Sequence, residues 1–424
     1  MKYFNQYIDD LKTLISFKST LGAPEDNAPF GAENKKALDF FLSRAKDFGF
    51  KTINYDGYAG EVIFGEGEEI GVIGHLDVVP VGIGWNTDPW TLTKIDGVYY
   101  GRGVSDDKLP LLSCLYALRE IKESNIVPTR KIRLFVGCNE ETGWQDVDYL
   151  TCHTTLPEYG FSPDGNFPLS YAEKGILIAK FNLPTLKNFY DLKGGTAVNA
   201  VCDYASVRAR TGGIDKTLLD KFNLKLSDGN LIESFGKAAH GSTPHLGKNA
   251  LLPLFSYFTA VGEDFSKITD CLFLDKHGIS NLTNEQGKVT FSPNIIEPDG
   301  DGFTLACDCR IPAPLSPKDV TDILDGFNLK YFAEEKHPPV MVEKDGWFVQ
   351  TLLGAYNAVT GDNAAPISMG GSTFARAFKK GCAFGPKFNG HDDKIHDANE
   401  NIPEENLLNA FKIYKLALEK LLTE

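Results

Sequence analysis

The chain has 424 residues, of which 42% are hydrophobic and 24% charged, and its formal net charge is -14. This length exceeds the roughly 250 to 300 residues at which a single core stops growing, so we expect two domains. The acidic balance argues against nucleic acid or an anionic membrane as a partner, since both require clustered Lys and Arg. The first residues are polar, and no apolar run is long enough to span a membrane, so we expect a cytoplasmic protein.

Helical and strand patterns alternate over the first part of the chain. The predicted elements are helices over 4–15, 35–48 and 111–124 and strands over 61–64, 70–74 and 132–136. Such alternation indicates an α/β domain with a mostly parallel sheet, whose ligands gather at strand ends.

The pattern changes between residues 177 and 340, where the sequence is more polar and rich in strands and turns, with one helix near 250–261. Helical patterns return afterwards, and the last predicted helix covers 404–422. We therefore predict an α/β three-layer sandwich formed by residues 1–176 and 341–424, with an α+β domain inserted over 177–340.

Two motifs place imidazole and carboxylate groups at predicted strand ends or turns. In GVIGHLDVVP, His75 and Asp77 are two residues apart at the end of an apolar strand, so both side chains leave the same face. A pair of this type either belongs to a metal site or lies in a loop where both side chains are hydrogen-bonded and have no further role. In GRGVSDDKLP, Asp106 and Asp107 precede a helix, where two carboxylates also suit the helix dipole without any further role.

Three further motifs add candidate ligands. Glu140 and Glu141 follow a strand in GCNEETGW, and their proximity raises their pKa values, which suits a group that takes a proton near neutral pH. Asp164 lies in the turn FSPDGNFP and His396 in HDANE, with His391 as the nearby alternative to His396. The candidate ligands are His75, Asp106, Glu141, Asp164 and His396. Nitrogen and oxygen ligands of this kind suit zinc, manganese or cobalt.

These motifs resemble the aminoacylase, carnosinase and carboxypeptidase G family of co-catalytic di-zinc metallopeptidases, and within it the PepV-like dipeptidases. The motifs GHLDVVP, GRGVSDDK, NEETGW, SPDGNFP, GKAAHGSTPHLGKNA, MGGSTFAR, AFGP and HDANE follow the family's order along almost the whole chain. The resemblance implies a first metal ion held by His75 and Asp164 and a second held by Glu141 and His396. It implies that Asp106 bridges the two ions.

The resemblance also implies roles beside the metal ligands. Glu140 would be the general base, and Asp77 would support His75. A cis peptide bond would join Asp106 to Asp107.

The inserted domain would then be a lid that contacts the substrate. His240 would stabilise the oxyanion, although a His beside Gly and Ser is also typical of a surface turn. Asn199 and Arg310 would bind substrate, Arg310 through a terminal carboxylate, unless it is only a charge on an edge strand. Gly370 and Gly371 would let the backbone approach the substrate, or would only form a turn.

The function implied is hydrolysis of dipeptides with two divalent ions, zinc in the first place and manganese or cobalt as alternatives. We expect a monomer, because the segment inserted over 177–340 exceeds a minimal domain of about 100 residues. Asp rather than Glu at position 164 favours a dipeptidase. An N-acyl or N-succinyl amino acid deacylase and a catalytically silent ligand-binding protein are the alternatives. The chain departs from the family pattern at Leu109, Cys138 and Cys202, none of which is a proposed ligand.

Overall fold

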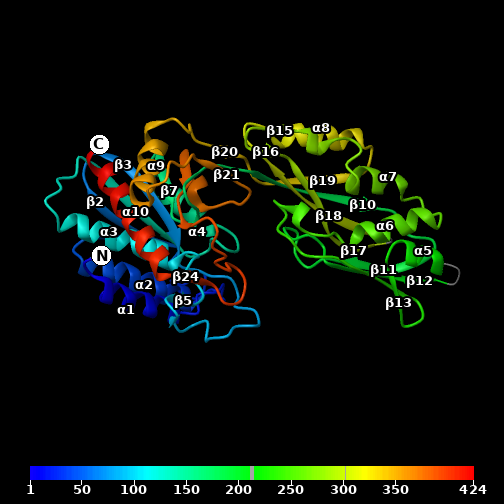
Figure 1. Cartoon of the computed structure of the whole chain (residues 1–424), viewed down its shortest axis with the longest axis horizontal. Coiled ribbons are helices and arrows are strands. Elements are labelled where there is room, and N and C mark those ends of the chain that lie inside the picture. Colours follow the sequence, from blue (N-terminus) through cyan, green and yellow to red (C-terminus); the bar gives the residue numbers. More distant parts are fainter. Residues whose placement is uncertain (211–213, 301) are drawn as a thin grey trace. The chain divides into compact units, whose positions relative to one another are not determined.

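The computed structural model describes residues 1–210, 214–300 and 302–424, which form two compact units. The first unit comprises Met1–Tyr171, Met341–Ile367 and Thr373–Glu424, drawn mainly in blue, cyan, orange and red in Figure 1. The second comprises Ala172–Val340 and Ser368–Ser372, mainly green and yellow. Within the described residues, every helix is too short or too polar to cross a membrane.

The first unit is built around a nine-stranded sheet in the order β1-β2-β6-β3-β7-β22-β9-β20, with β21 paired to β9. Strands β6, β3, β7 and β22 are parallel, whereas β2 and β9 pair with this centre in the antiparallel sense. The strands are β1 (Lys51–Tyr55), β2 (Ala59–Gly65), β3 (Glu68–His75), β6 (Arg130–Gly137), β7 (Tyr159–Ser162), β9 (Ser170–Glu173), β20 (Val340–Met341), β21 (Ile367–Met369) and β22 (Lys380–Ala383). The predicted α/β class is confirmed.

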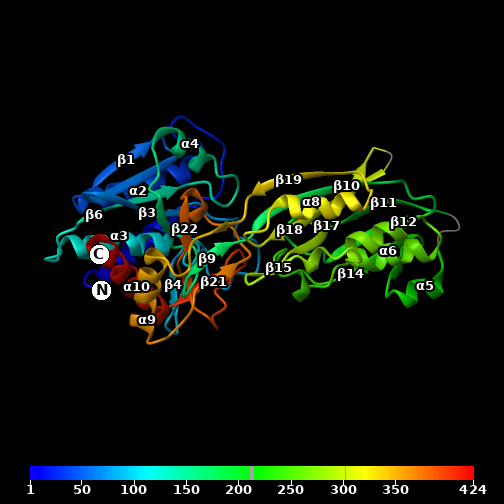
Figure 2. The ribbon, with the colours of Figure 1, turned by 90° about the horizontal axis from the view of Figure 1, so that it is seen from above.

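Helices cover both faces of this sheet. Gly74 of β3 faces Leu111 of α3, and Gly60 of β2 faces Leu38 of α2, so α2 and α3 lie on one face. Phe135 of β6 points the other way, into a cluster that includes residues of α4. Figure 2 shows α3 and α10 on one side of the sheet and α4 on the other. The helices are α1 (Phe4–Ser16), α2 (Ala32–Asp47), α3 (Lys108–Lys122), α4 (Gln145–His153), α9 (Trp347–Thr360) and α10 (Glu404–Thr423).

Short elements complete the first unit. A small three-stranded sheet has the order β24-β5-β4, and β8 pairs with β23 in a two-stranded sheet. These elements are β4 (Thr93–Ile95), β5 (Val98–Tyr100), β8 (Gly165–Asn166), β23 (Pro386–Lys387), β24 (Asn401–Pro403) and the 3-10 helix η4 (Phe374–Ala377).

The second unit contains an eight-stranded sheet in the order β13-β14-β12-β11-β17-β18-β10-β19, in which neighbouring strands are antiparallel. Its core joins Phe181 and Leu305 of the sheet to Phe255 of α6 and Leu324 of α8. The main elements are β10 (Gly175–Leu183), β11 (Phe189–Gly194), β12 (Tyr204–Ala209), β13 (Lys225–Ser227), β14 (Leu231–Phe235), β17 (Thr290–Asp299), β18 (Gly302–Ile311), β19 (Tyr331–His337), α5 (Lys216–Lys221), α6 (Leu251–Ala260), α7 (Ser266–Ile268) and α8 (Pro317–Gly326). A two-stranded sheet adds β15 (Thr283–Asn284) and β16 (Gly287–Lys288).

Candidate metal centre

The carboxyl ends of three parallel strands bring the predicted ligands of the first unit together. His75 ends β3, Glu140 and Glu141 follow β6, and Asp164 follows β7. Because β3 pairs in parallel with both β6 and β7, these ends lie at one edge of the sheet. Asp106 comes from the loop before α3.

His75 is fully buried and its ring is oriented by the backbone. Its Nδ1 lies 3.0 Å from the carbonyl oxygen of Asp77, and because a carbonyl only accepts, Nδ1 carries the proton in the neutral ring. Nε2 then presents a lone pair. Among the residues that the structure describes, this buried nitrogen has no hydrogen-bond partner, although it lies 3.0 Å from Oδ1 of Asp106 and 3.8 Å from Oδ2 of Asp164. Ligand atoms that converge without bonding to each other have the geometry of a cation site.

Asp106 faces two imidazoles, one with each carboxylate oxygen. Oδ1 lies 3.0 Å from Nε2 of His75, and Oδ2 lies 3.0 Å from Nε2 of His396. His396 Nε2 also lies 3.1 Å from Oε2 of Glu141. The peptide bond between Asp106 and Asp107 is cis, which confirms that prediction.

Two groups of ligand atoms result, each within 4.8 Å: His75, Glu140 and Asp164 in one, and Asp106, Glu141 and His396 in the other. All are imidazole nitrogens or carboxylate oxygens, the donors that zinc and manganese accept. The residues present therefore fit a pair of divalent ions.

Asp77 acts on the loop after β6 as well as on His75. Its Oδ1 and Oδ2 each lie 3.1 Å from a backbone nitrogen, Oδ1 accepting from Glu140 and Oδ2 from Glu141. Its carboxylate is 3.4 Å from Nδ1 of His75, farther than its own carbonyl. Asp77 therefore positions two neighbouring side chains of the cluster through their backbone.

The cluster carries more negative groups than its two imidazoles balance. Burial, reinforced by the charge of Asp106, raises the pKa of Asp164 to about 8 and raises that of Glu141. Burial also raises the pKa of Glu140 well above its ordinary value, with Asp164 adding to the effect. Burial alone would lower the pKa of His396, but its hydrogen bonds to Asp106 and Glu141 raise it to about 11. A bound cation would relieve this repulsion between carboxylates.

Two buried carboxylates, which are not among the residues predicted from the sequence, hold the loops of the cluster. Asp146 accepts the backbone N–H groups of Cys138 at 2.7 Å and Asn139 at 2.8 Å, just before Glu140. Glu400 accepts backbone N–H groups of the loop that carries Asp106. Glu400 is the last residue of the motif HDANE, and Asp146 follows GCNEETGW by two residues, but neither was given a role, because hydrogen bonding to a distant backbone depends on the fold.

The predicted lid residues lie near one another within the second unit. The backbone N–H of Gly241, next to His240, donates to the carbonyl of Asn199 at 2.7 Å. A side chain at Gly241 would meet Oδ2 of Asp308, which pairs with Arg310. Unit 2 thus gathers these residues around one part of its sheet.

Arg310 lies in an interior strand, β18, and is 4% exposed, so the interpretation as an edge-strand charge is wrong. Its Nε and Nη2 donate to Asp308 at 2.7 and 2.9 Å, and its Nη1 donates to the carbonyl of Gly370 at 3.1 Å. A Cβ at Gly370 would meet the side chain of Ser242, whereas a Cβ at Gly371 would meet the end of the Met369 side chain. At Gly370 the backbone thus lies close to protein atoms of the same unit, and its approach to substrate, like that of Gly371, stays a prediction.

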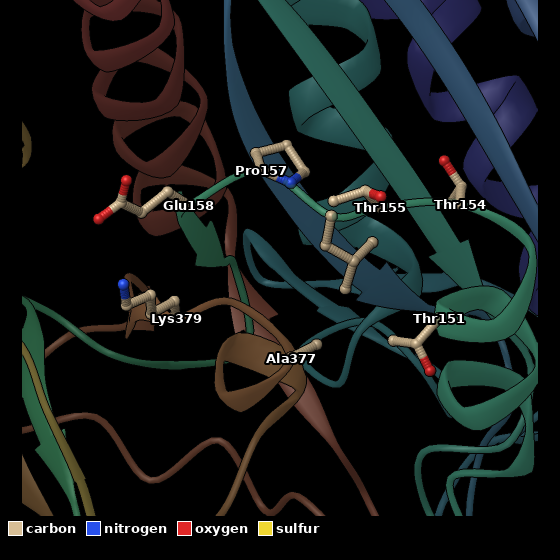
Figure 3. A pocket seen from close by; sticks show the side chains of 8 residues that line it. Thr151, Thr154, Thr155, Pro157, Glu158, Ala377 and Lys379 are labelled. Atoms are coloured by element: carbon tan, nitrogen blue, oxygen red, sulfur yellow. The ribbon is translucent and has the colours of Figure 1, made fainter.

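A hollow of about 460 Å³ lies elsewhere in the first unit, around the end of α4 and the loop before β7 (Figure 3). Glu158 and Lys379 line one side of it, and Thr151 and Thr154 the other. None of the predicted site residues lines this hollow, so the metal centre and the hollow are separate features.

A family model described as peptidase family M20/M25/M40 matches residues 71–420. The chain belongs to this peptidase family. The predicted resemblance and the prediction of an enzyme of the peptidase class are thereby confirmed.

Relatives and solved structures of the M20 peptidases agree with this assignment. A Staphylococcus epidermidis protein named "Putative dipeptidase" is 31% identical over 100% of this chain and 98% of its own length. "Putative dipeptidase YtjP" of Bacillus subtilis is 32% identical, covering 93% of this chain and 92% of its own. A Staphylococcus aureus tripeptidase shares the fold with a TM-score of 0.62 at 15% identity, covering 99% of each chain. Human carnosine dipeptidase 1 does so with a TM-score of 0.59 at 15% identity, covering 100% of this chain and 97% of its own.

Proposed function

We propose that this M20 peptidase is a dipeptidase whose first unit holds two divalent metal ions. One observation carries the proposal: each carboxylate oxygen of Asp106 lies 3.0 Å from a different imidazole, that of His75 or that of His396. A carboxylate placed in this way suits a bridge between two ions. The names of the relatives support the dipeptidase class.

The proposed ligands divide into two sites that share Asp106. We assign His75 and Asp164 to the first site, where Oδ1 of Asp106 lies 3.0 Å from Nε2 of His75, and Glu141 and His396 to the second. Glu140 also lies near His75 and Asp164, and we assign it another role. When bound there, two divalent ions polarise a peptide carbonyl and lower the pKa of a water. We expect zinc, with manganese or cobalt as alternatives, because the ligands are nitrogen and oxygen.

Glu140 is the proposed general base. The loop that Asp77 fixes holds the carboxyl group of Glu140 at the cluster. Burial raises the pKa of Glu140, so its carboxylate can take a proton from the water near neutral pH. It then passes this proton to the nitrogen of the leaving amine.

We assign the second unit, residues 177–340 in the predicted division, the role of a lid with substrate contacts. His240 would stabilise the oxyanion, and Asn199 and Arg310 would bind the substrate. Arginine has five N–H donors, and Asp308 and Gly370 use three of those on Arg310. The others suit a terminal carboxylate.

A substrate panel tests this function. The purified protein is stripped of metal, reloaded with zinc, manganese or cobalt, and assayed with dipeptides, tripeptides and N-acyl amino acids. We expect dipeptides to give the largest kcat/KM. Preference for N-acyl amino acids would instead indicate a deacylase, and binding of dipeptides without turnover by any loaded form would indicate a silent binding protein.

A further inference from the structure

A buried ion pair joins Arg102 to Glu400 next to the loops of the metal centre. Neither residue is one of the predicted metal ligands. Arg102 is 1% exposed and Glu400 is 0% exposed, and Nη1 of Arg102 donates to Oε2 of Glu400 at 2.8 Å. Removing two charges from water carries a large desolvation cost, so such a pair persists where many hydrogen bonds satisfy it.

Glu400 accepts hydrogen bonds from the loop that carries Asp106. The backbone N–H groups of Gly103, Ser105 and Asp106 donate to its carboxylate, at 2.8 Å for Ser105 and 3.2 Å for Asp106. This carboxylate therefore bonds to the backbone of the proposed bridging ligand itself.

Arg102 extends the same contacts to two other loops. Its Nη2 donates to the carbonyl of Pro80 at 3.3 Å and to that of Asp397 at 3.2 Å. Pro80 follows the segment HLD, which begins at His75, the last residue of β3, and Asp397 is the neighbour of His396. The pair thus touches the segments that follow His75, precede α3 and contain His396.

The local fold explains why Glu400 meets this loop. Asn401 of β24 pairs with Tyr100 of β5 in an antiparallel ladder, so Glu400 and Gly101 leave the ladder opposite each other. Gly101 donates its N–H to the carbonyl of Glu400 at 3.2 Å. The side chain of Glu400 then lies inside the loop that begins there.

We infer that Glu400, together with Arg102, is a positioning residue that presets the spacing between Asp106 and His396 before metal binds. This inference rests on the proposed two-metal function. His396 needs such support because its side chain is 55% exposed and its backbone has a φ of 63°, which is unfavourable for a residue with a side chain. A prearranged ligand pair binds an ion without the cost of ordering its loops.

The chain offers a matched control in Glu61. It is also 0% exposed and pairs with an arginine, its Oε1 accepting from Nε of Arg133 at 2.6 Å. Among the described residues, the side-chain hydrogen bonds of Glu61 come from Arg133 of β6 and Tyr55 of β1, and none comes from a ligand loop. Glu400→Gln and Glu61→Gln therefore remove the same charge from comparable surroundings.

The experiment compares the zinc affinity of wild type, Glu400→Gln and Glu61→Gln in titrations against a chromophoric chelator. Each titration is done at a temperature below the unfolding midpoint of the variant. We expect Glu400→Gln to weaken zinc binding on the order of 10- to 100-fold, the usual effect of losing a partner behind a metal ligand. Glu61→Gln should leave the affinity unchanged. Equal affinity in Glu400→Gln and wild type, or equal weakening in both variants, would overturn the inference.

Hydrogen exchange of the metal-free proteins gives a second measurement that does not depend on zinc. Amides of residues 101–107 should exchange faster in Glu400→Gln than in wild type and remain unchanged in Glu61→Gln. Unchanged exchange in Glu400→Gln would also overturn the inference. If wild type binds fewer than two ions while hydrogen exchange at residues 101–107 changes as expected, the proposed function fails and the positioning of the loop stands.

Arg102→Lys, which keeps the charge but loses the planar guanidinium, replaces Glu400→Gln if the latter does not fold.

Discussion

Glu140 and Glu141 are neighbours in the chain, yet their carboxylates have different surroundings. Glu141 lies 3.1 Å from His396, whereas Glu140 groups with His75 and Asp164. We predict that Glu140→Gln retains both ions while kcat falls by roughly 10² to 10⁴, because the general base is lost. Steady-state kinetics and elemental analysis of the same sample measure the two effects.

Glu141→Gln is the control for this substitution. A neutral amide is a poorer ligand than a carboxylate, so this variant should lose one ion and recover part of its activity in excess metal. Loss of metal in Glu140→Gln with retention in Glu141→Gln would exchange the two roles. Full activity in both would contradict the hydrolase mechanism.

Asp106 is expected to matter for both ions, because its two oxygens face two different imidazoles. Asp106→Ala should therefore lower the affinity for both, whereas Asp164→Asn should lower the affinity for one. Metal content after dialysis against a weak chelator distinguishes the two variants. One tightly bound ion surviving in Asp106→Ala would rule out the bridge.

Single residues differ in how well the sequence predicts them. His75 and Glu141 stand at or just after the ends of strands predicted from apolar runs, and a parallel sheet brings such ends together, so their proximity follows from the pattern. Asp164 was placed only in a turn, because the short strand β7 before it (Tyr159–Ser162) was not predicted. Glu400 accepts backbone N–H groups of residues far earlier in the chain, and Asp146 accepts those of residues across a turn. Their role follows from the path of loops, which periodicity does not describe.

At the scale of elements, two neighbouring strands leave room for an aromatic ring. Gly71 of β3 pairs with Gly160 of β7, and a Cβ on either would lie 2.2 or 2.4 Å from the ring of Phe378. We predict that Gly160→Ala lowers the free energy of unfolding by about 1 to 3 kcal/mol, since overpacking forces the ring to move. Urea denaturation of the metal-loaded protein measures this change.

The control keeps the methyl group and shrinks the ring. Gly160→Ala combined with Phe378→Leu should be less destabilised than the sum of the two single variants, because the smaller side chain removes the clash. Simple additivity would show that the ring does not cause the effect.

Elements with long apolar periodicity were predicted better than short or polar ones. Helix α10 (Glu404–Thr423) was expected over 404–422, whereas α3 begins at Lys108, before the predicted start at 111. Pro110 is tolerated in a first helical turn, so it did not mark a boundary. Helix α4 was missed because Val147 and Leu150 are among its few buried apolar residues.

At the scale of the whole molecule, the carboxylate cluster makes the stability of the metal-free protein depend on pH. Asp164 has a pKa of about 8 when folded against 3.8 ordinarily, and the pKa of Glu141 is raised from 4.5. At a pH between the ordinary and the raised pKa of each group, the folded protein keeps protons that the unfolded chain has lost. The free energy of unfolding therefore falls as pH rises. We predict this decline between pH 4.5 and about pH 8 in urea titrations of chelator-treated protein.

Metal should reverse this dependence, because the ions bind only deprotonated ligands and their contribution grows with pH. Asp164→Asn removes one of the raised groups, so its metal-free form should show a shallower decline. A stability that rises with pH in metal-free wild type would contradict the prediction.

The chain as a whole is predicted to be a monomer, because its second unit is large enough to form a domain by itself. Light scattering of the metal-loaded protein should give the mass of one chain, 46.7 kDa. A mass of two chains would contradict this prediction.

The spread of the ligands along the chain has a consequence for biosynthesis. His75, Asp106, Glu141 and Asp164 emerge from the ribosome well before His396, and the residues of the second unit are made in between. At about 5 to 20 residues per second, that interval lasts tens of seconds. During translation the nascent chain therefore exposes an incomplete set of ligands beside a growing second unit. In the proposed two-metal site, capture of the second ion would wait until the last part of the polypeptide has been synthesised and has docked onto the first sheet.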